Sequence, residues 1–132
     1  MDINLPPKPK KTQIAGWNKK KENQYWKRTP LLKDWDLISV KERQEFIKQE
    51  FTRRRDGYWF MNNGTSTYIT GQHYYYLNWC KIDIGYPDYR DRDRRFFLFW
   101  DHCNTDPASY GMIMVKHRRE GASWKGACIA LN

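Results

Sequence analysis

The sequence has no long hydrophobic run and few cysteines, and both absences exclude whole classes of protein. No apolar stretch approaches the ~20 residues that a membrane-spanning helix needs, and the start, MDINLPPKPKK, lacks the apolar segment of a secretory signal peptide. Cys80, Cys103 and Cys128 are far apart and form no CxxC pair, so neither a zinc ribbon nor a disulfide framework is indicated. We therefore expect a cytoplasmic protein with reduced thiols.

Acidic residues are scarce relative to basic ones: 24 Lys and Arg stand against 15 Asp and Glu, which gives a net charge of +9. Such a balance favours polyanionic partners, above all nucleic acid, but it does not define a fold. Much of the excess lies in residues 1–30, which we expect to form a flexible basic arm that either contacts double-stranded DNA or is only a solvated tail. The candidate DNA contacts are Lys8, Lys10, Lys11, Lys19, Lys20 and Lys21.

Two local signals predict a helix followed by a β-hairpin. Ser39 with Glu42 three residues later is a capping box, which predicts a helix over 40–55. The buried face of this helix would contain Phe46, Ile47 and Phe51. Asn63-Gly64 lies between aromatic and β-branched residues, which is the strongest short signal for a hairpin, so we expect two antiparallel strands within 58–70.

The remaining segments predict aromatic helices and one short strand. Thr70-Gly71 is a break, and residues 72–82 fit a helix or a strand, because periodicity alone does not separate the two. Residues 90–103 favour a helix with exposed arginines and with four packed aromatic side chains, Phe96, Phe97, Phe99 and Trp100. GMIMV, at 111–115, predicts a short buried strand, and a further helix should follow from Ser123. The expected fold class is α/β, with α+β for the elements of this chain taken alone.

Three other clusters have an ordinary interpretation beside a functional one. Ion pairing with nearby arginines, or a metal cluster, would explain the carboxylates Asp83, Asp88, Asp91 and Asp93. His102 and Cys103 with Cys80 would need a fourth zinc ligand at suitable spacing. The aromatic block 73–79 is either a small core or a platform for stacking bases. His73 as a general base has no nucleophile that the sequence places beside it.

The end of the chain contains a degenerate phosphate-binding pattern. A P-loop reads GxxxxGK[ST]: its backbone N–H groups cradle phosphates, its lysine reaches the β- and γ-phosphates, and its hydroxyl ligates Mg²⁺. Aligned on Gly121 and Ser123, the chain has Ala122 in place of the lysine. Cations within the loop would replace it, namely Lys116, which occupies the first glycine position, Arg118 and Arg119. The alternative is a basic turn capped by Ser123.

Three sequence blocks together resemble one family. The run RREGAS, at 118–123, resembles the degenerate Walker A motif of the large terminase subunits of tailed phages, in which an early Arg or Lys replaces the late lysine. Upstream, GYWFMNNGTSTYITGQHYYYLNWCKI at 57–82 and YRDRDRRFFLFWD at 89–101 are similar to the region before the ATPase core in terminases of crAss-like and related Bacteroidetes phages. The resemblance covers about residues 56–132.

The resemblance implies an ATP-driven motor that packages phage DNA in the host cytoplasm, with ATP and Mg²⁺ as cofactors. By position, Arg118 would contact the phosphates with help from Lys116 or Arg119. Gly121 and Ala122 would bring the backbone close to the phosphates, and Ser123 would ligate Mg²⁺. The partners implied are double-stranded DNA, a portal protein and a small terminase subunit, within an oligomeric motor. The block at 90–100 would border the adenine pocket.

The chain departs from this family in what it lacks. Residues 1–132 contain no Walker B strand, catalytic glutamate, coupling motif or nuclease domain, so we expect a fragment that does not hydrolyse ATP by itself. Its expected parts are a basic arm over 1–30, a helix, hairpin and aromatic region over 31–108, and the incomplete start of a P-loop ATPase domain over 109–132. The alternative functions are a nucleic-acid-binding module without nucleotide and a small structural or interaction protein.

Overall fold

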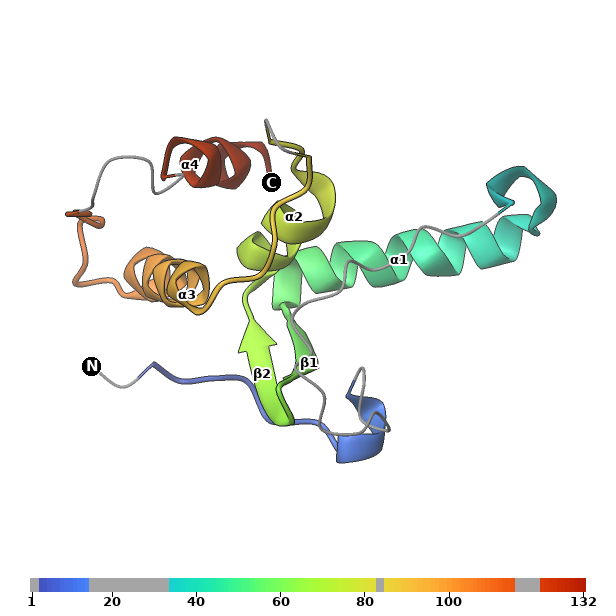
Figure 1. Cartoon of the computed structure of the whole chain (residues 1–132), viewed down its shortest axis with the longest axis horizontal. Helices are drawn as coiled ribbons and strands as arrows, with labels where there is room; N and C mark the ends of the chain where they lie inside the picture. The colour runs from blue at the N-terminus through green and yellow to red at the C-terminus, as the bar shows by residue number, and fades with distance from the viewer. Residues whose placement is uncertain (1–2, 15–33, 83–84, 116–121) are drawn as a thin grey trace.

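Helices and one small two-stranded sheet make up the described part of the protein (Figure 1). The computed structural model describes residues 3–14, 34–82, 85–115 and 122–132. The longer elements, in chain order, are α1 (Val40–Asp56), β1 (Tyr58–Asn62), β2 (Thr65–Ile69), α2 (Gly71–Trp79), α3 (Asp91–Thr105) and α4 (Ala122–Leu131), with short 3-10 turns at Lys11–Gln13 and Trp35–Leu37. The expected α+β class is confirmed at this level.

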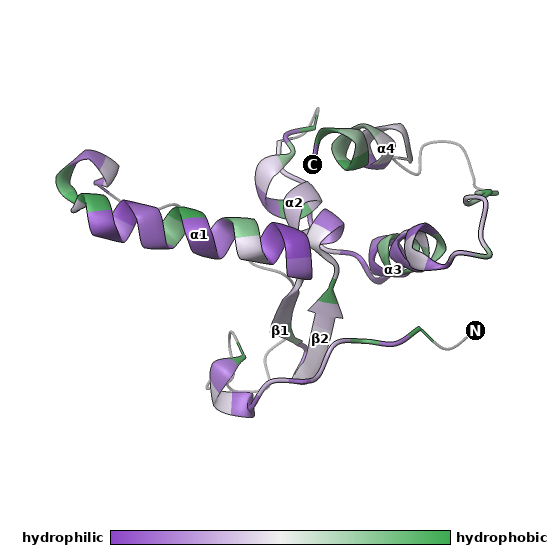
Figure 2. Cartoon of the chain, turned by 180° about the vertical axis from the view of Figure 1, so that it is seen from behind, coloured by the Kyte–Doolittle hydropathy of each residue, from purple (hydrophilic) through white to green (hydrophobic). Residues whose placement is uncertain are grey.

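Helix α1 begins and ends as its sequence predicts. The Ser39 hydroxyl accepts a hydrogen bond from the Glu42 N–H at 3.2 Å, and Gly57 ends the helix with a φ of 92° that other residues rarely adopt. The expected buried face is wrong, since Ile47 is 44% exposed and Phe51 is 60% exposed. The reason is that α1 extends away from the body of the protein (Figure 1). Among the described residues, its N-terminal half meets the short turn at Trp35–Leu37, where Trp35 packs edge-on against Phe46. Figure 2 shows that this helix is mostly hydrophilic, with separate hydrophobic patches.

The predicted hairpin is confirmed. Strands β1 and β2 pair antiparallel, from Tyr58 opposite Ile69 to Asn62 opposite Thr65. Asn63 and Gly64 join them with φ angles of 49° and 78°, the positive values that a tight two-residue hairpin turn requires. The hairpin places Phe60 and Ile69 in the core.

Helix α2 lies at the centre of the protein and resolves the ambiguity of residues 72–82, most of which it contains. It contacts α1, α3 and α4, so residues on every side of it are buried and no amphipathic period can appear in the sequence. Thr70 caps it by accepting a hydrogen bond from the His73 N–H at 3.2 Å. Gly71 allows the helix to start against α1, because a side chain there would collide with the Arg54 carbonyl.

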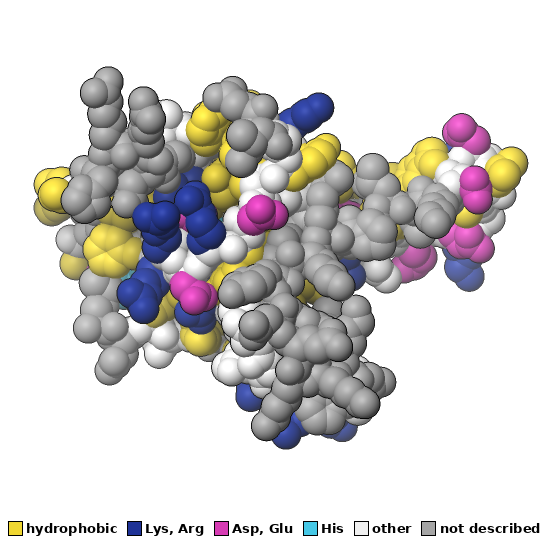
Figure 3. Space-filling view, viewed as in Figure 1, with side chains coloured by type: hydrophobic (Ala, Val, Ile, Leu, Met, Phe, Trp, Pro, Cys, Tyr) yellow, Lys and Arg dark blue, Asp and Glu magenta, His cyan; other side chains and the backbone are white. Residues whose placement is uncertain are grey.

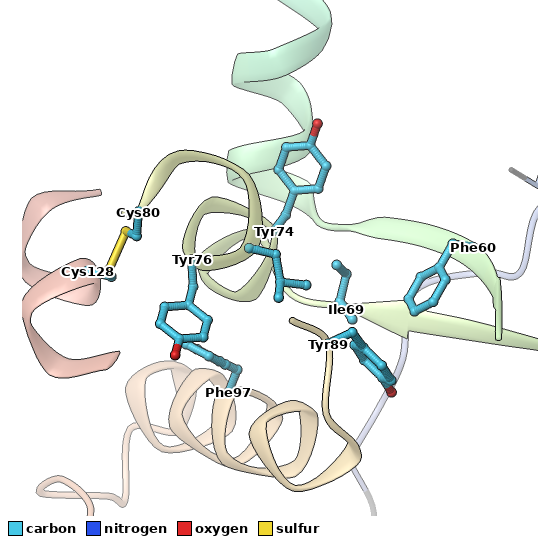
Figure 4. Packing of buried hydrophobic residues seen from close by; sticks show 9 residues of the cluster. Phe60, Ile69, Tyr74, Tyr76, Cys80, Tyr89, Phe97 and Cys128 are labelled. Carbon is cyan, nitrogen blue, oxygen red and sulfur yellow. A yellow bond between two sulfur atoms is a disulfide. The ribbon is translucent and has the colours of Figure 1, made fainter. Parts of the chain in front are cut away.

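The hydrophobic core is small and largely aromatic. Figure 4 shows rings from α2, α3 and the preceding loop gathered around the end of the hairpin. Its buried residues are Phe60, Ile69, Tyr74, Tyr76, Leu77, Cys80, Tyr89, Phe97 and Cys128. The expected helix at 90–103 is confirmed as α3, in which Phe97 is fully buried and Phe96 packs against the core. Phe99 and Trp100 are half-buried.

The buried strand expected at 111–115 is not formed, and this prediction is wrong. These residues have no regular secondary structure, and Ile113 and Val115 are 94% and 97% exposed. In the part of the chain that the structure describes, the only strands are β1 and β2, and they pair with each other. A strand needs a neighbour to satisfy its backbone N–H and C=O groups, and none of the described residues supplies one here.

The expectation of unpaired cysteines is also wrong. Cys80, just after α2, and Cys128 of α4 form a disulfide, with Cα atoms 6.4 Å apart, whereas Cys103 is free (Figure 4). A pairing across 48 residues leaves no trace in local spacing.

None of the described helices is both long enough and apolar enough to cross a bilayer.

Candidate functional site

Only the end of the candidate phosphate loop lies within the described residues. Lys116, Arg118, Arg119 and Gly121 fall outside them, so their positions are not described. Ala122 and Ser123 are the first two residues of α4, and Ser123 is exposed. The expected cap is therefore corrected: Ser123 lies inside the first turn of the helix rather than before it. The helix itself begins where the sequence places it, directly after the glycine loop.

The first turn of α4 is attached to α3 by a buried ion pair. Lys125 Nζ lies 3.0 Å from Asp93 Oδ1, and the two residues are 1% and 0% exposed. Asp93 Oδ2 also accepts a hydrogen bond from Arg90 Nε at 3.0 Å. The Lys125 ammonium lies 4.7 Å from the centre of the Phe96 ring, a cation–π distance. Two cations thus share one fully buried carboxylate.

Two further contacts attach the rest of α4. One turn after Lys125, Cys128 is bonded to Cys80 at the end of α2. At the end of the helix, Asn132 donates to Gln72 Oε1 and accepts from Arg54 Nε, both at 3.1 Å. These contacts connect α4 to three neighbouring elements through one face, while Trp124 and Leu131 on the other face are 40% and 74% exposed.

A hollow of about 360 Å³ lies where the ends of α1, α2 and α4 meet. It is lined by Phe51, Arg54, Arg55, Gly71, Gln72, Asp101 and Asn132. The Arg54 guanidinium lies over the rings of both Phe51 and Tyr75, at 5.0 and 4.5 Å from their centres. Arg55 is paired with Asp56 through two hydrogen bonds. Because Arg54, Arg55 and Asp101 all line it, this hollow is of mixed charge. Desolvation raises the pKa of the Asp101 carboxyl.

Glu50 is the other buried carboxylate, and it connects α1 to α2. Its oxygens accept hydrogen bonds from the Tyr74 hydroxyl at 2.8 and 2.9 Å and from Trp79 Nε1 at 3.1 Å. Arg53 Nη1 pairs with it at 2.9 Å. Both oxygens of this carboxylate therefore have donors, which is the arrangement of a structural anchor rather than of a catalytic base.

His73 is buried within aromatic rings and is not placed for base catalysis. Its ring stacks on Phe97 at 4.8 Å and on Tyr89 at 5.7 Å, and neither ring nitrogen has a hydrogen-bond partner among the described residues. Desolvation, with the nearby charges of Arg94 and Lys125, lowers the pKa of His73 to about 3. The imidazole is therefore neutral at physiological pH and serves as a core ring.

The structure also distinguishes between the two interpretations of the aromatic block 73–79 and of the aspartate cluster. The block 73–79 supplies core residues, which supports the packing interpretation. Of the four aspartates, Asp93 is ion-paired, Asp91 accepts from the Tyr89 hydroxyl at 2.8 Å, Asp88 is exposed, and Asp83 lies outside the described residues. Among the residues described, no three His, Cys, Asp or Glu side chains are grouped to hold a metal ion.

Two groups of exposed cations in the described chain bear on DNA binding. Lys8, Lys10 and Lys11 are exposed near the N-terminus, whereas the structure does not describe the other DNA-contact candidates, Lys19, Lys20 and Lys21. Arg90, Arg92 and Arg95 are exposed at the start of α3. Figure 3 shows basic side chains over the α3 region with acidic side chains among them. This second region is therefore less strongly basic than its arginines alone suggest.

Sequence reasoning missed the buried charges of the site. Glu50 meets its partners on α2 across 24 and 29 residues, and Asp93 meets Lys125 across 32. These contacts form only when the helices pack. The single available signal was a lysine inside the apolar, alanine-rich segment 122–131.

Comparison of the whole chain with protein families, curated proteins and solved structures finds no match.

Proposed function

We propose that the chain is the N-terminal part of a large terminase subunit, an ATP-driven motor that packages phage DNA. The support comes from the order of its parts, since the blocks at 57–82 and 89–101 precede a basic glycine loop. The observation that carries the proposal is that α4 begins at Ala122, directly after this loop. The first N–H groups of a helix lack intrahelical partners and, with the helix dipole, favour a bound anion.

In this proposal the loop binds the phosphates of ATP. Arg118 is the main cation, assisted by Lys116 or Arg119, because a planar guanidinium binds phosphate oxygens through two parallel hydrogen bonds. The exposed hydroxyl of Ser123 contributes to the Mg²⁺ that accompanies ATP. Residues 109–132 begin an ATPase domain. The proposed partners are the portal protein, the small terminase subunit and double-stranded DNA, and the proposed location is the host cytoplasm.

Fluorescence anisotropy of an ATP analogue with a fluorescent ribose group tests this function. We expect the chain to bind the analogue with Mg²⁺, Arg118→Ala to weaken binding about tenfold, and Arg119→Ala to weaken it less. Arg95→Ala, which removes an equal charge from an exposed position on α3, serves as the control and should leave the affinity unchanged. Equal binding by the wild type and Arg118→Ala, or no binding by the wild type, would refute the proposal.

A nucleic-acid-binding module without nucleotide is the second candidate. The observation that favours it is the net charge of +9, together with the exposed Lys8, Lys10 and Lys11. Both functions allow DNA binding, so the nucleotide titration separates them. A chain that binds DNA and fails to bind the ATP analogue would support this second candidate.

A further inference from the structure

Helix α4 contributes little to the hydrophobic core. Among the described residues, Cys128 is the one member of the core that this helix supplies, and Ile129 packs against the core beside it. Most of its other apolar or small residues are exposed, namely Trp124, Gly126, Ala127, Ala130 and Leu131. The remaining core residues all precede α4 in the chain. The packing of the hairpin, α2 and α3 therefore does not depend on this helix.

The noncovalent contacts of α4 specify its place more than they hold it there. Lys125 and Asp93 are 1% and 0% exposed, and taking two charges out of water costs about as much as their attraction returns. When α4 moves away, the ammonium regains water while Asp93 keeps its ion pair with Arg90. The two hydrogen bonds of Asn132 are exposed, so water competes for the same groups.

The disulfide is therefore the strongest attachment of α4. It bonds Cys128 to Cys80, which lies just after α2, and α4 packs on α2 (Figure 4). An isolated helix of 10 residues is marginal in water, so α4 needs its attachment to the body in order to persist as a helix.

We propose that the Cys80–Cys128 disulfide is a redox switch that controls the docking of α4. When the bond is reduced, α4 leaves α2 and α3 while the rest of the protein stays folded. Its departure uncovers the Asp93 carboxylate and the ring of Phe96, which Lys125 contacts in the docked helix. The inference is independent of the proposed function, because it concerns only how α4 is attached.

A low-molecular-weight thiol is the reductant in this switch. Its thiolate attacks one sulfur of the bond, forms a mixed disulfide and releases the other cysteine as a thiolate. A second thiol then attacks the mixed disulfide. Two thiols are thereby oxidised to one small-molecule disulfide, and their two protons end on Cys80 and Cys128. An oxidised thiol of the same class reverses both steps and restores the bond.

Hydrogen exchange measured by mass spectrometry tests the switch on the oxidised chain and on the chain reduced with dithiothreitol. We expect exchange in a peptide covering 122–132 to become at least about a hundredfold faster on reduction, because its amides lose their helix. Peptides from β2 and α2 should stay protected in both states. Treatment of the reduced chain with oxidised glutathione should restore slow exchange in 122–132.

Alkylation after denaturation verifies the two states. The label should reach only Cys103 in the oxidised chain and all three cysteines in the reduced chain. The double substitution Cys80→Ala with Cys128→Ala is the matched control, and its peptide 122–132 should exchange fast with or without dithiothreitol. Cys103→Ala keeps the bond and should respond to dithiothreitol like the wild type. If the double variant does not fold, the comparison of the two wild-type states decides.

Three results would overturn the proposal. Equally slow exchange of 122–132 in the oxidised and reduced chains would show that the noncovalent contacts alone hold α4. Loss of protection in β2 and α2 on reduction would show that the bond is a structural crosslink of the whole protein. Labelling of all three cysteines in the chain treated with oxidised glutathione would show that the bond does not form.

Discussion

At the scale of single residues, buried polar groups connect helices that share little apolar surface. Glu50 connects α1 to α2, and Asp93 connects α3 to α4. Each is at most 4% exposed, and each receives hydrogen bonds from groups far away in the sequence. In a small protein whose charged residues make up 30% of the chain, such anchors define how the helices meet.

Replacing Glu50 tests the anchor of α1. In Glu50→Leu, the Tyr74 hydroxyl and Trp79 N–H lose their acceptor, and each such loss in a buried place costs about 1–3 kcal/mol. We expect the free energy of unfolding in urea to fall by about 2–5 kcal/mol. Glu45→Leu, at an exposed position of the same helix, should change it by at most about 0.5 kcal/mol. Equal effects of the two substitutions would contradict the role of Glu50.

The buried imidazole of His73 predicts a pH dependence of stability. Its pKa falls from 6.5 to about 3 in the folded state, so the unfolded chain binds more protons at this residue between those values. Stability therefore decreases as the pH falls below 6.5, by about 1.4 kcal/mol per pH unit, and is unaffected by this residue above it. His73→Phe should remove this part of the decrease between pH 6.5 and 4.5 in urea titrations. A variant with the same slope as the wild type would show that His73 is not buried as a neutral ring.

At the scale of elements, the sequence predicts what local chemistry determines. The cap at Ser39 and the turn at Asn63-Gly64 involve residues within a few positions of one another, and both were predicted correctly. The segment 71–79 could not be assigned, because a helix buried on all sides has no polar face. The strand at 111–115 was wrong, because a strand depends on partners that local sequence does not contain.

In the candidate site too, local features could be predicted from the sequence and long-range contacts could not. The start of α4 after the glycine loop was predictable from the residues of the loop, whereas its attachments were not. Lys125 meets Asp93 across 32 residues, and Cys128 meets Cys80 across 48. Such pairs are created by the packing of whole helices, so only the three-dimensional structure identifies them.

Substitution of Gly71 tests the close contact between α1 and α2, and substitution of Gly126 is its control. A methyl group on Gly71 would collide with the Arg54 carbonyl, a backbone atom that cannot move without shifting α1. We expect Gly71→Ala to destabilise the protein by about 1–3 kcal/mol. Gly126→Ala is the matched control: it lies within α4 with open space around it, and we expect it to stabilise the protein by about 0.5–1 kcal/mol. Thermal unfolding measures both, and stabilisation by Gly71→Ala would refute the close contact.

At the scale of the whole molecule, the distribution of charge predicts how the protein binds DNA. The excess of basic residues is concentrated in residues 1–30, so binding should be weak, indifferent to sequence and strongly salt-dependent. Each phosphate neutralised on duplex DNA adds about 0.9 to the slope of log affinity against log salt concentration. Deleting residues 1–30 should therefore flatten this slope in anisotropy measurements. An unchanged slope would instead indicate that DNA contacts the exposed arginines at the start of α3. In that case the double substitution Arg90→Ala with Arg95→Ala should flatten the slope.

The central claim, that the loop before α4 binds nucleotide phosphates, is tested most directly by amide chemical shifts. The measurement is a titration of the ¹⁵N-labelled chain with MgADP, with Arg118→Ala as the matched variant. The account predicts that the largest shifts fall on the amides of Gly121, Ala122 and Ser123 and disappear in the variant. Shifts confined to the lysines at 8–21, or the same shifts at 121–123 in Arg118→Ala, would contradict it.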